Sequence, residues 1–223
     1  AHYMMGGVVF KADTSTDLPG LFAAGEDTGG VHGANRLGGN GVANSTVFGG
    51  IAGDAMARYV MGKSHLAYDD ESVEQSISAH QAPLQQAPGD IEFIRDELAA
   101  CMWDQVGILR NQADLEAARI RLDKLDNILH TMGVGETNRA FNLTWQDWMN
   151  LRNLILVSQS VVEAALAREN SRGAHYREDY PEEGDLETSF FTAVHMKDEQ
   201  LVIEKRPVTF SMVRPGETIL VEA

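Results

Sequence analysis

The sequence predicts a mixed chain in three parts: an α/β segment of strand, glycine-rich loop and helix over residues 1–62, an α-helical bundle over 63–180 and a small β tail over 181–223. Most of the 21 glycines lie before Gly62, which is typical of a backbone that approaches a ligand or another backbone closely. Apolar residues then recur at helical spacing up to about Asn170, and two runs with strand character follow.

The first part alternates between short apolar runs and turn residues. Gly7–Lys11 predicts a short strand, Asp17–Gly20 a turn, and Leu21–Gly25 a second strand whose unbroken apolar run indicates burial. A loop follows from Glu26 to Asn40. From Gly41 to about Met61, apolar residues near helical spacing alternate with small ones, which predicts a helix packed closely against a sheet.

The middle part predicts helices over Tyr68–Ala82, Asp90–Leu109 and Ala113–Met132 and from Thr144 onward. Asp90 is a favourable N-cap, Gly133 marks a helix end, and Thr144–Asp147 resembles a capping box with Asp in place of Glu. Long helices joined by short loops favour an antiparallel bundle.

The tail begins with an acidic loop over residues 177–185. Phe190–His195 and Leu201–Phe210 then predict two strands around the turn Lys197–Gln200, which together form a hairpin.

Composition excludes several classes of function. The net charge of −15 disfavours binding to nucleic acid or to an anionic membrane surface. A single cysteine, Cys101, excludes an intrachain disulfide and a multi-cysteine metal site, and it is expected to be a small buried helix residue. No apolar run is long enough to span a bilayer and no secretory signal is visible.

Chemistry is concentrated between Gly25 and Gly41. A strand that leads through a glycine-rich loop into a helix exposes backbone N–H groups, and the helix N-terminus favours negative charge. His32 and Arg36 stand here in an otherwise acidic chain, and Arg can hold a carboxylate in a bidentate manner. The alternative is a structural turn in which Arg36 pairs with Glu26. The segment matches neither a Walker loop nor a dinucleotide fingerprint.

Three motifs, His2–Gly7, Leu18–Glu26 and His32–Asn40, follow one another at a distinctive spacing. Together they resemble the flavoproteins of the succinate dehydrogenase, fumarate reductase and L-aspartate oxidase family. Met102–Arg110 also fits, and Ser171–Pro181 is similar to the segment that closes the helical domain of the family. The resemblance covers most of the chain and is weakest in the last strands.

The resemblance implies that residues 1–62 end the Rossmann-like FAD-binding domain and the capping domain, with the nucleotide-binding half upstream. It implies that His2 and Arg36 bind the carboxylates of the substrate, and that Glu26, Asn40 and the backbone of Gly41 and Val42 contact FAD. The proton-donating Arg of the family is implied to lie upstream, so no catalytic residue is expected here and the isolated chain is expected to be inactive.

One departure concerns the start of the predicted helix. Family members have Asn-Ser-Leu where this chain has Asn40-Gly41-Val42, so a hydroxyl near the flavin is lost while the backbone donors remain. The loop from Glu26 to Arg36 is also one residue shorter than in the family.

The resemblance implies FAD-dependent oxidation or reduction of a C4 dicarboxylate such as succinate or fumarate, by hydride transfer to or from the flavin. The implied partner is an iron–sulfur electron-transfer subunit, and the implied location is cytoplasmic, peripheral at the inner face of the membrane. Two alternatives stay open: an L-aspartate-oxidase-like enzyme, and a non-catalytic helical module that docks the iron–sulfur subunit.

Other chemically suggestive residues have structural interpretations. Trp103, Trp145 and Trp148 lie on predicted helices and are expected in the core or at a bundle interface. His175 is expected to brace the bundle, together with nearby arginines, against the flavin domain or a partner. No metal site is expected.

Overall fold

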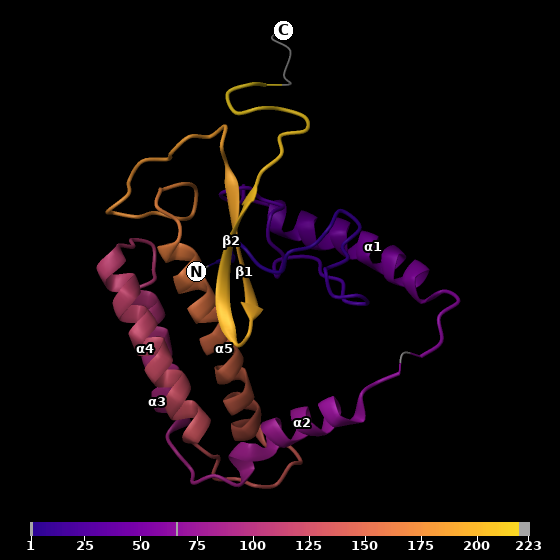
Figure 1. Cartoon of the computed structure of the whole chain (residues 1–223), viewed down its shortest axis with the longest axis vertical. Helices are drawn as coiled ribbons and strands as arrows, with labels where there is room; N and C mark the ends of the chain where they lie inside the picture. The colour runs from indigo at the N-terminus through magenta and orange to yellow at the C-terminus, as the bar shows by residue number, and fades with distance from the viewer. Residues whose placement is uncertain (1, 66, 219–223) are drawn as a thin grey trace.

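The computed structural model describes residues 2–65 and 67–218, in the element order shown in Figure 1. The helices are α1 (Asn40–Val60), α2 (Asp70–Gln81), the 3₁₀ turn η1 (Ala82–Leu84), α3 (Ile91–Asp104), α4 (Gln112–Thr131) and α5 (Leu143–Leu166). The strands are β1 (Phe190–Lys197) and β2 (Gln200–Pro207), which pair antiparallel. The described chain is therefore rich in helix with one small two-stranded sheet, as the sequence predicts for its later parts.

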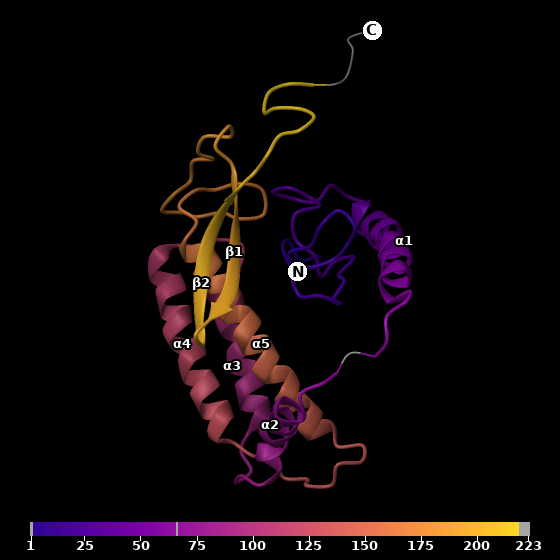
Figure 2. The ribbon, with the colours of Figure 1, turned by 45° about the vertical axis from the view of Figure 1, so that its right-hand side comes forward.

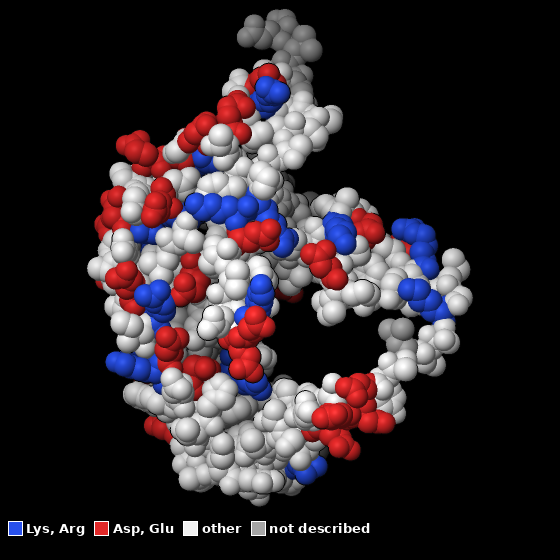
Figure 3. Space-filling view, in the orientation of Figure 1, with Lys and Arg blue, Asp and Glu red and all other residues white. Residues whose placement is uncertain are grey.

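The helices α3, α4 and α5 form a bundle, and the β1–β2 hairpin lies along α5 (Figure 1). The loops of residues 2–39 lie between the hairpin and α1, and α1 stands away from the bundle (Figure 2). The space-filling view shows an open gap between the bundle and the stretch of chain that joins α1 to α2 (Figure 3). The first part of the chain thus meets the rest near the hairpin end of the bundle.

Apolar residues at helical spacing build the bundle core. On α4 the buried leucines 115, 122 and 129 recur every seven residues, and on α5 Leu151, Ile155 and Val162 face them. Cys101 is fully buried on α3, as expected, and burial raises the pKa of its thiol. Each fully buried aliphatic side chain contributes about 1.5–3 kcal/mol of transfer free energy, so this core dominates the stability of the bundle.

The three tryptophans differ in burial. Trp148 is buried in the core, and its indole N–H donates to the carbonyls of Leu129 and Met132 at the end of α4. Trp145 is half-buried and donates to the carbonyl of His80. Trp103 is 76% exposed, so the described residues do not give it the predicted burial in a core or at an interface.

Capping side chains fix where the helices begin. The carboxylate of Asp90 accepts from the backbone N–H of Phe93 at 2.9 Å, which confirms the predicted N-cap of α3. The predicted capping box at Thr144 is wrong, because α5 begins one residue earlier, after Asn142. The amide oxygen of Asn142 accepts from the N–H of Trp145 at 2.8 Å, while its amide nitrogen donates to the carbonyls of Glu136 and Asn138.

Two helix ends depend on close backbone approach. Helix α3 ends at Asp104 rather than near Leu109, and a Cβ at Gly107 would collide with the carbonyl oxygen of Trp103. Gly133 follows α4 as predicted, but it is not a left-handed C′ residue. A Cβ there would collide with the carbonyl of Gln86, so Gly133 is needed for space and not for a positive φ.

The tail hairpin turns on two residues, Asp198 and Glu199, with φ of 49° and 62°. Two successive positive φ values belong to the type I′ turn, whose twist matches that of the flanking strands. Strand β2 ends at Pro207, three residues before the predicted Phe210. The hairpin therefore forms where the sequence predicts it, slightly displaced at one end.

The predicted strands of the first part are wrong as regular elements. Gly7–Lys11 makes one isolated bridge, between Val8 and Thr28, and Leu21–Gly25 makes one between Ser15 and Phe22. A strand needs a neighbour along its whole length, and the described residues supply none beyond these bridges. The predicted burial holds only in part: Leu21 is exposed, residues 22–24 are half-buried and Gly25 is buried.

Helix α1 lies where it is predicted but is not packed against a sheet. Its apolar residues Val42, Val47, Met56 and Val60 are exposed, and a Cβ at Gly49, Gly50 or Gly53 would meet no atom within 4 Å. Within the described residues, the three glycines of α1 therefore have no close neighbour, whereas Ala52 and Ala55 on another side of the helix are buried.

A buried guanidinium closes the upper end of the bundle. Arg177 is 1% exposed; it donates to the carbonyl of Ala165 at 2.9 Å and twice to the carboxylate of Asp179, each time at 2.7 Å. Asp179 also accepts from the backbone N–H of Gln112 at 2.9 Å, at the start of α4. These bonds lower the pKa of Asp179 from its ordinary 3.8 to about 2, chiefly through the hydrogen bonds from Arg177.

We predict that Asn142→Ala lowers the free energy of unfolding by about 1–2 kcal/mol, because it removes the cap of α5 and a side chain that bonds two carbonyls. Thr144→Ala is the matched control and should change the free energy by less than about 0.5 kcal/mol. Urea unfolding of both variants measures the difference. Equal effects would contradict Asn142 as the cap, and a larger effect of Thr144→Ala would place the cap at Thr144.

We predict that Asp179→Asn lowers the free energy of unfolding at pH 7 by about 1–3 kcal/mol, because the guanidinium of Arg177 stays buried without its carboxylate. The pKa of Asp179 is depressed on folding, so its stabilisation is complete above about pH 4 and is lost as the pH falls to about 2. The variant should therefore lose less stability than the wild type over that window. The exposed pair of Asp147 with Arg95 supplies the control, since Asp147→Asn should cost less than about 1 kcal/mol.

Candidate functional site

The glycine-rich loop ends in an uncapped helix. Gly39 precedes α1 with φ of 85°, no side chain caps the first turn, and that turn holds no acidic residue. The first N–H groups of a helix have no partner within it. The N–H of Asn40 donates to the carbonyl of Leu37 at 3.3 Å, which leaves those of Gly41 and Val42 available to an acceptor. Together with the helix dipole they form a site that favours negative charge.

Asn44, one turn into α1, ties the loop to the helix. It is buried, and its amide nitrogen lies 3.1 Å from the carbonyl of Gly25 and 3.3 Å from both the hydroxyl of Tyr3 and Nε2 of His32. The hydroxyl of Tyr3 also lies 3.3 Å from Nε2 of His32. One side chain thus fixes the segments at residues 3, 25 and 32 relative to the helix start.

Arg36 has no carboxylate partner among the described residues. Its guanidinium lies over the ring of Tyr3, 4.3 Å from the centroid, and donates to the carbonyl of Leu37 at 3.3 Å. Its Nε is buried without a hydrogen-bond partner. The alternative in which Arg36 pairs with Glu26 is not what the structure shows, because Glu26 accepts from the backbone N–H of Met4 at 2.8 Å.

Gly41 makes room for this arrangement. A Cβ at Gly41 would lie 2.8 Å from Cε2 of Tyr3, closer than real Cβ contacts come. Glycine at this position therefore leaves the space that the Tyr3 ring occupies beneath Arg36.

The structure places the predicted site residues around one loop end. Arg36 and Glu26 both contact the segment that follows His2: the backbone N–H of Arg36 lies 3.2 Å from the sulfur of Met5. Asn40, Gly41 and Val42 form the first turn of α1, with Val42 78% exposed, and the side chain of His2 is exposed.

Sequence reasoning did not single out Tyr3 or Asn44 as site residues. Tyr3 lies inside a recognised motif, but its ring contact with Arg36 joins residues 33 positions apart. Asn44 follows Asn40 by one helical turn and so lies on the same face of α1. This spacing was the sequence signal from which its contact with the loop could have been predicted.

His175 connects the bundle to this region. Nδ1 of His175 accepts from Arg110 at 3.0 Å, and Nε2 donates to the carbonyl of Arg168 at 3.2 Å. Burial, together with the charges of the neighbouring arginines, lowers the pKa of His175 to about 4. The ring is therefore neutral at pH 7, and its adjoining turn contacts the glycine-rich loop, as expected of a bracing residue.

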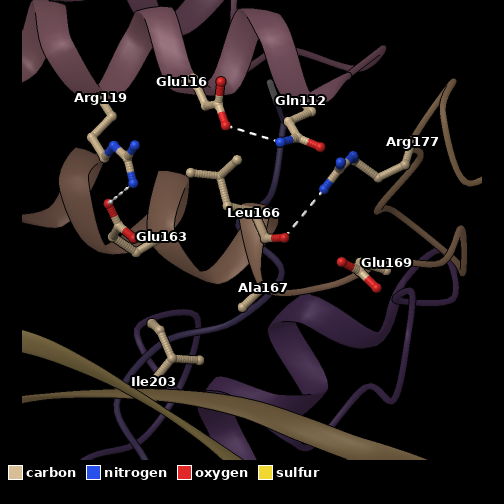
Figure 4. Close-up of a pocket in the computed structure, with 9 residues that line it drawn as sticks. All are labelled: Gln112, Glu116, Arg119, Glu163, Leu166, Ala167, Glu169, Arg177 and Ile203. Atoms are coloured by element: carbon tan, nitrogen blue, oxygen red, sulfur yellow. Dashed lines mark hydrogen bonds and ion pairs between the residues drawn. The ribbon is translucent and has the colours of Figure 1, made fainter.

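A separate cavity of about 340 Å³ lies between the ends of α4 and α5 and strand β2 (Figure 4). Most of its polar side chains pair with one another or with backbone: Arg119 lies 4.0 Å from Glu163, Gln112 donates to Glu116, and Arg177 donates to the carbonyl of Leu166 (Figure 4). The carboxylate of Glu169 is drawn without a partner, so the described lining of the cavity presents no unpaired cation to an anionic ligand (Figure 4).

The described residues contain no group of three side chains placed to hold a metal ion. No helix among them combines the length and apolar character needed to cross a bilayer. Acidic and basic side chains are interspersed over the visible bundle face, with an acidic group on α2 (Figure 3).

Comparison with known families gives two matches. The family described as fumarate reductase flavoprotein C-term matches residues 95–219, and the FAD binding domain family matches residues 1–42. The boundary of the second match falls inside the first turn of α1.

The curated relatives include a fumarate reductase flavoprotein subunit of Mycobacterium tuberculosis, which is 33% identical over 232 residues, covering 98% of this chain and 39% of that protein. L-aspartate oxidase of Acinetobacter baylyi is 32% identical over 207 residues, covering 91% of this chain and 36% of that protein. The chain spans about a third of the length of the curated relatives it matches.

The similar solved structures include quinol fumarate reductase of E. coli, with a TM-score of 0.88 and 28% identity over 97% of this chain and 38% of that chain. The Mycobacterium smegmatis Sdh1 complex gives a TM-score of 0.85 at 37% identity, covering 94% of this chain and 36% of that chain.

We predict that Asn44→Ala lowers the free energy of local opening by about 0.5–1.5 kcal/mol, because the bond from Asn44 to the carbonyl of Gly25 is lost while the two bonds from Thr28 to that carbonyl remain. Amide hydrogen exchange across Gly25–His32 should accelerate accordingly. Thr46→Ala, an exposed position on the same helix, should leave exchange there within about 0.5 kcal/mol. Unchanged exchange in the Asn44 variant would contradict its role in tying the loop to α1.

Proposed function

Because the chain belongs to the fumarate reductase flavoprotein family, we propose that it supplies one wall of the FAD and substrate site of an oxidoreductase acting on a C4 dicarboxylate. In this proposal Arg36 and His2 bind the substrate carboxylates, while Glu26, Asn40, Gly41 and Val42 contact FAD. The cofactor itself follows from the family, whose FAD binding domain matches residues 1–42.

The unpaired guanidinium of Arg36 carries the proposal. A buried or half-buried arginine ordinarily has an anionic partner, since desolvating a charge without one is costly. Arg36 instead stacks on Tyr3 and keeps its Nε buried and unpartnered. A substrate carboxylate fits this donor set, because a guanidinium offers two parallel N–H groups to two oxygens.

The residues present also fit FAD. The first turn of α1 offers backbone N–H groups without a capping side chain, and a Cβ at the preceding Gly39 would meet no atom within 4 Å, so the space beside the helix start is open. When bound, FAD supplies a two-electron acceptor or donor for the substrate. N–H groups at a helix start favour negative charge, so α1 would stabilise a more negative state of a cofactor seated there.

This chain contributes binding and orientation. Arg36 holds one carboxylate in a fixed plane, because the Tyr3 ring beneath it and the bond to Leu37 restrict the guanidinium. His2, close by on the same segment as Tyr3, would hold the second carboxylate. Two fixed ends orient the carbon atoms between them, and cationic groups stabilise charge that accumulates on the carboxylates during reaction.

A second candidate is an L-aspartate-oxidase-like activity. It is favoured by a relative of that name at 32% identity over 207 residues. The carboxylate clamps would be shared, so the two activities differ at residues that contact the 2-position of the substrate.

We also propose that the intact enzyme passes electrons to an iron–sulfur subunit, through which it lies at the inner face of the membrane. The solved relatives include the Sdh1 complex, which supports an assembly of several subunits.

We predict that Arg36→Ala in the intact flavoprotein lowers kcat/KM for the dicarboxylate on the order of 100-fold, because one carboxylate loses its charged donor. Arg36→Lys should restore part of the loss, since it keeps the charge but not the two-pronged geometry. The measurement is anaerobic bleaching of the flavin by succinate or by aspartate, with flavin content determined for each variant. Arg58→Ala, an exposed arginine at the other end of α1, is the control and should bleach like the wild type.

Bleaching by succinate alone, lost in Arg36→Ala, would support the dicarboxylate proposal, and bleaching by aspartate would favour the second candidate. Bound flavin that neither compound reduces would move the substrate elsewhere. A protein without flavin would instead favour a docking module.

A further inference from the structure

The bundle touches the Arg36 loop through one tight turn. Residues Arg172 and His175 exchange backbone hydrogen bonds of 2.8 and 3.1 Å, so Gly173 and Ala174 form a two-residue hairpin turn. At its tip the N–H of Ala174 donates to the carbonyl of Ala34 at 3.0 Å. This bond joins the bundle to the loop two residues before Arg36.

Only a glycine permits this contact. Gly173 has φ of 59°, and a Cβ on it would collide with the carbonyl oxygen of Ala34. The first central position of such a turn favours glycine, and here it also removes the atom that would push the loop away.

The turn is held rigidly from the bundle side. Arg110 and the carbonyl of Arg168 fix both nitrogens of His175, and Arg172 donates to Ser189 and to the carbonyl of Glu183. In addition, Ser171 bonds the backbone of the buried Arg177.

The loop has open space beside its glycines. Gly33, Gly38 and Gly39 flank Arg36, and a Cβ at any of them would meet no atom within 4 Å. Arg36 itself rests on the Tyr3 ring, and its N–H lies near the sulfur of Met5 in the same N-terminal segment. The bond at Ala34 adds a contact from the bundle, which restricts where Arg36 can stand.

We propose that the Arg172–His175 turn is a positioning element for Arg36, so that the helical bundle sets the place of the carboxylate clamp. Gly173, Ala174 and His175 are then positioning residues, acting on the substrate through Ala34 and Arg36. This inference rests on the proposed role of Arg36 in carboxylate binding.

The test uses the intact flavoprotein and malonate, a dicarboxylate that is not oxidised, with binding followed by the flavin absorption spectrum. Gly173→Ala should raise the dissociation constant of malonate about 10–100-fold at unchanged flavin content, because the loop carrying Arg36 shifts. Gly184→Ala is the matched control: it also places alanine at a positive φ, 75°, in the same part of the chain, but its Cβ would meet nothing closer than 3.5 Å. It should bind malonate like the wild type.

A double variant separates positioning from a general loss of structure. If Gly173 acts through Arg36, then Arg36→Ala combined with Gly173→Ala should bind malonate no more weakly than Arg36→Ala alone. Additive losses would overturn the proposal. Should Gly173→Ala lose flavin, Ala174→Pro decides instead, since it removes the donating N–H without adding a Cβ at position 173.

The outcomes distinguish the two ideas. Wild-type malonate binding by Gly173→Ala overturns the positioning proposal, and Ala174→Pro takes its place where Gly173→Ala loses flavin. If Arg36→Ala binds malonate weakly in the same experiment, the proposed carboxylate binding by Arg36 still stands. Wild-type binding in Arg36→Ala removes the clamp itself, and the positioning proposal falls with it.

Discussion

The buried guanidinium of Arg177 is the contact on which the upper end of the molecule depends. It bonds the last carbonyls of α5 and the carboxylate of Asp179, which in turn caps the first N–H of α4. Two helices and the segment after them are therefore joined through one charged pair, of which the guanidinium is buried and the carboxylate is 29% exposed. Because a buried charge without its partner is costly, these elements keep one arrangement, and the turn at Gly173 is held in a defined place.

The candidate site has the opposite character, since its polar groups are left open. The start of α1 lacks a cap, Nε of Arg36 lacks a partner, and so does the amide oxygen of Asn44. Buried polar atoms are nearly always hydrogen-bonded in folded proteins. We propose that their coincidence around one loop end marks a ligand site. Nε of Arg36 and the first N–H groups of α1 would donate to a carboxylate or a flavin edge, whereas the amide oxygen of Asn44 would accept a hydrogen bond.

The sequence allowed the helices, the cap at Asp90 and the tail hairpin to be predicted, because apolar periodicity and short-range turn chemistry decide them. It did not allow the cap at Asn142, which competes with Thr144 two residues away and prevails through its bonds to the backbone of Glu136 and Asn138. The strands at Gly7–Lys11 and Leu21–Gly25 failed because a strand depends on neighbours that local sequence does not describe. For the site, motifs located Arg36, whereas the contacts of Tyr3 and Asn44 depend on residues brought together only by folding.

The linker between α1 and α2 connects the glycine-rich loop and the helical bundle covalently, and this connection determines how strong the contact between them must be. A single backbone hydrogen bond is worth about 0.5–1.5 kcal/mol, which could not hold two separate molecules together in dilute solution. Covalent connection replaces that bimolecular equilibrium with a high effective concentration, so weak contacts near Ala34 suffice to bias the loop. The covalent linker therefore lets the bundle bias the conformation of the loop. Cleaving the linker would lower the effective concentration of the bundle near Ala34 and weaken this bias, although both contact surfaces would stay chemically unchanged.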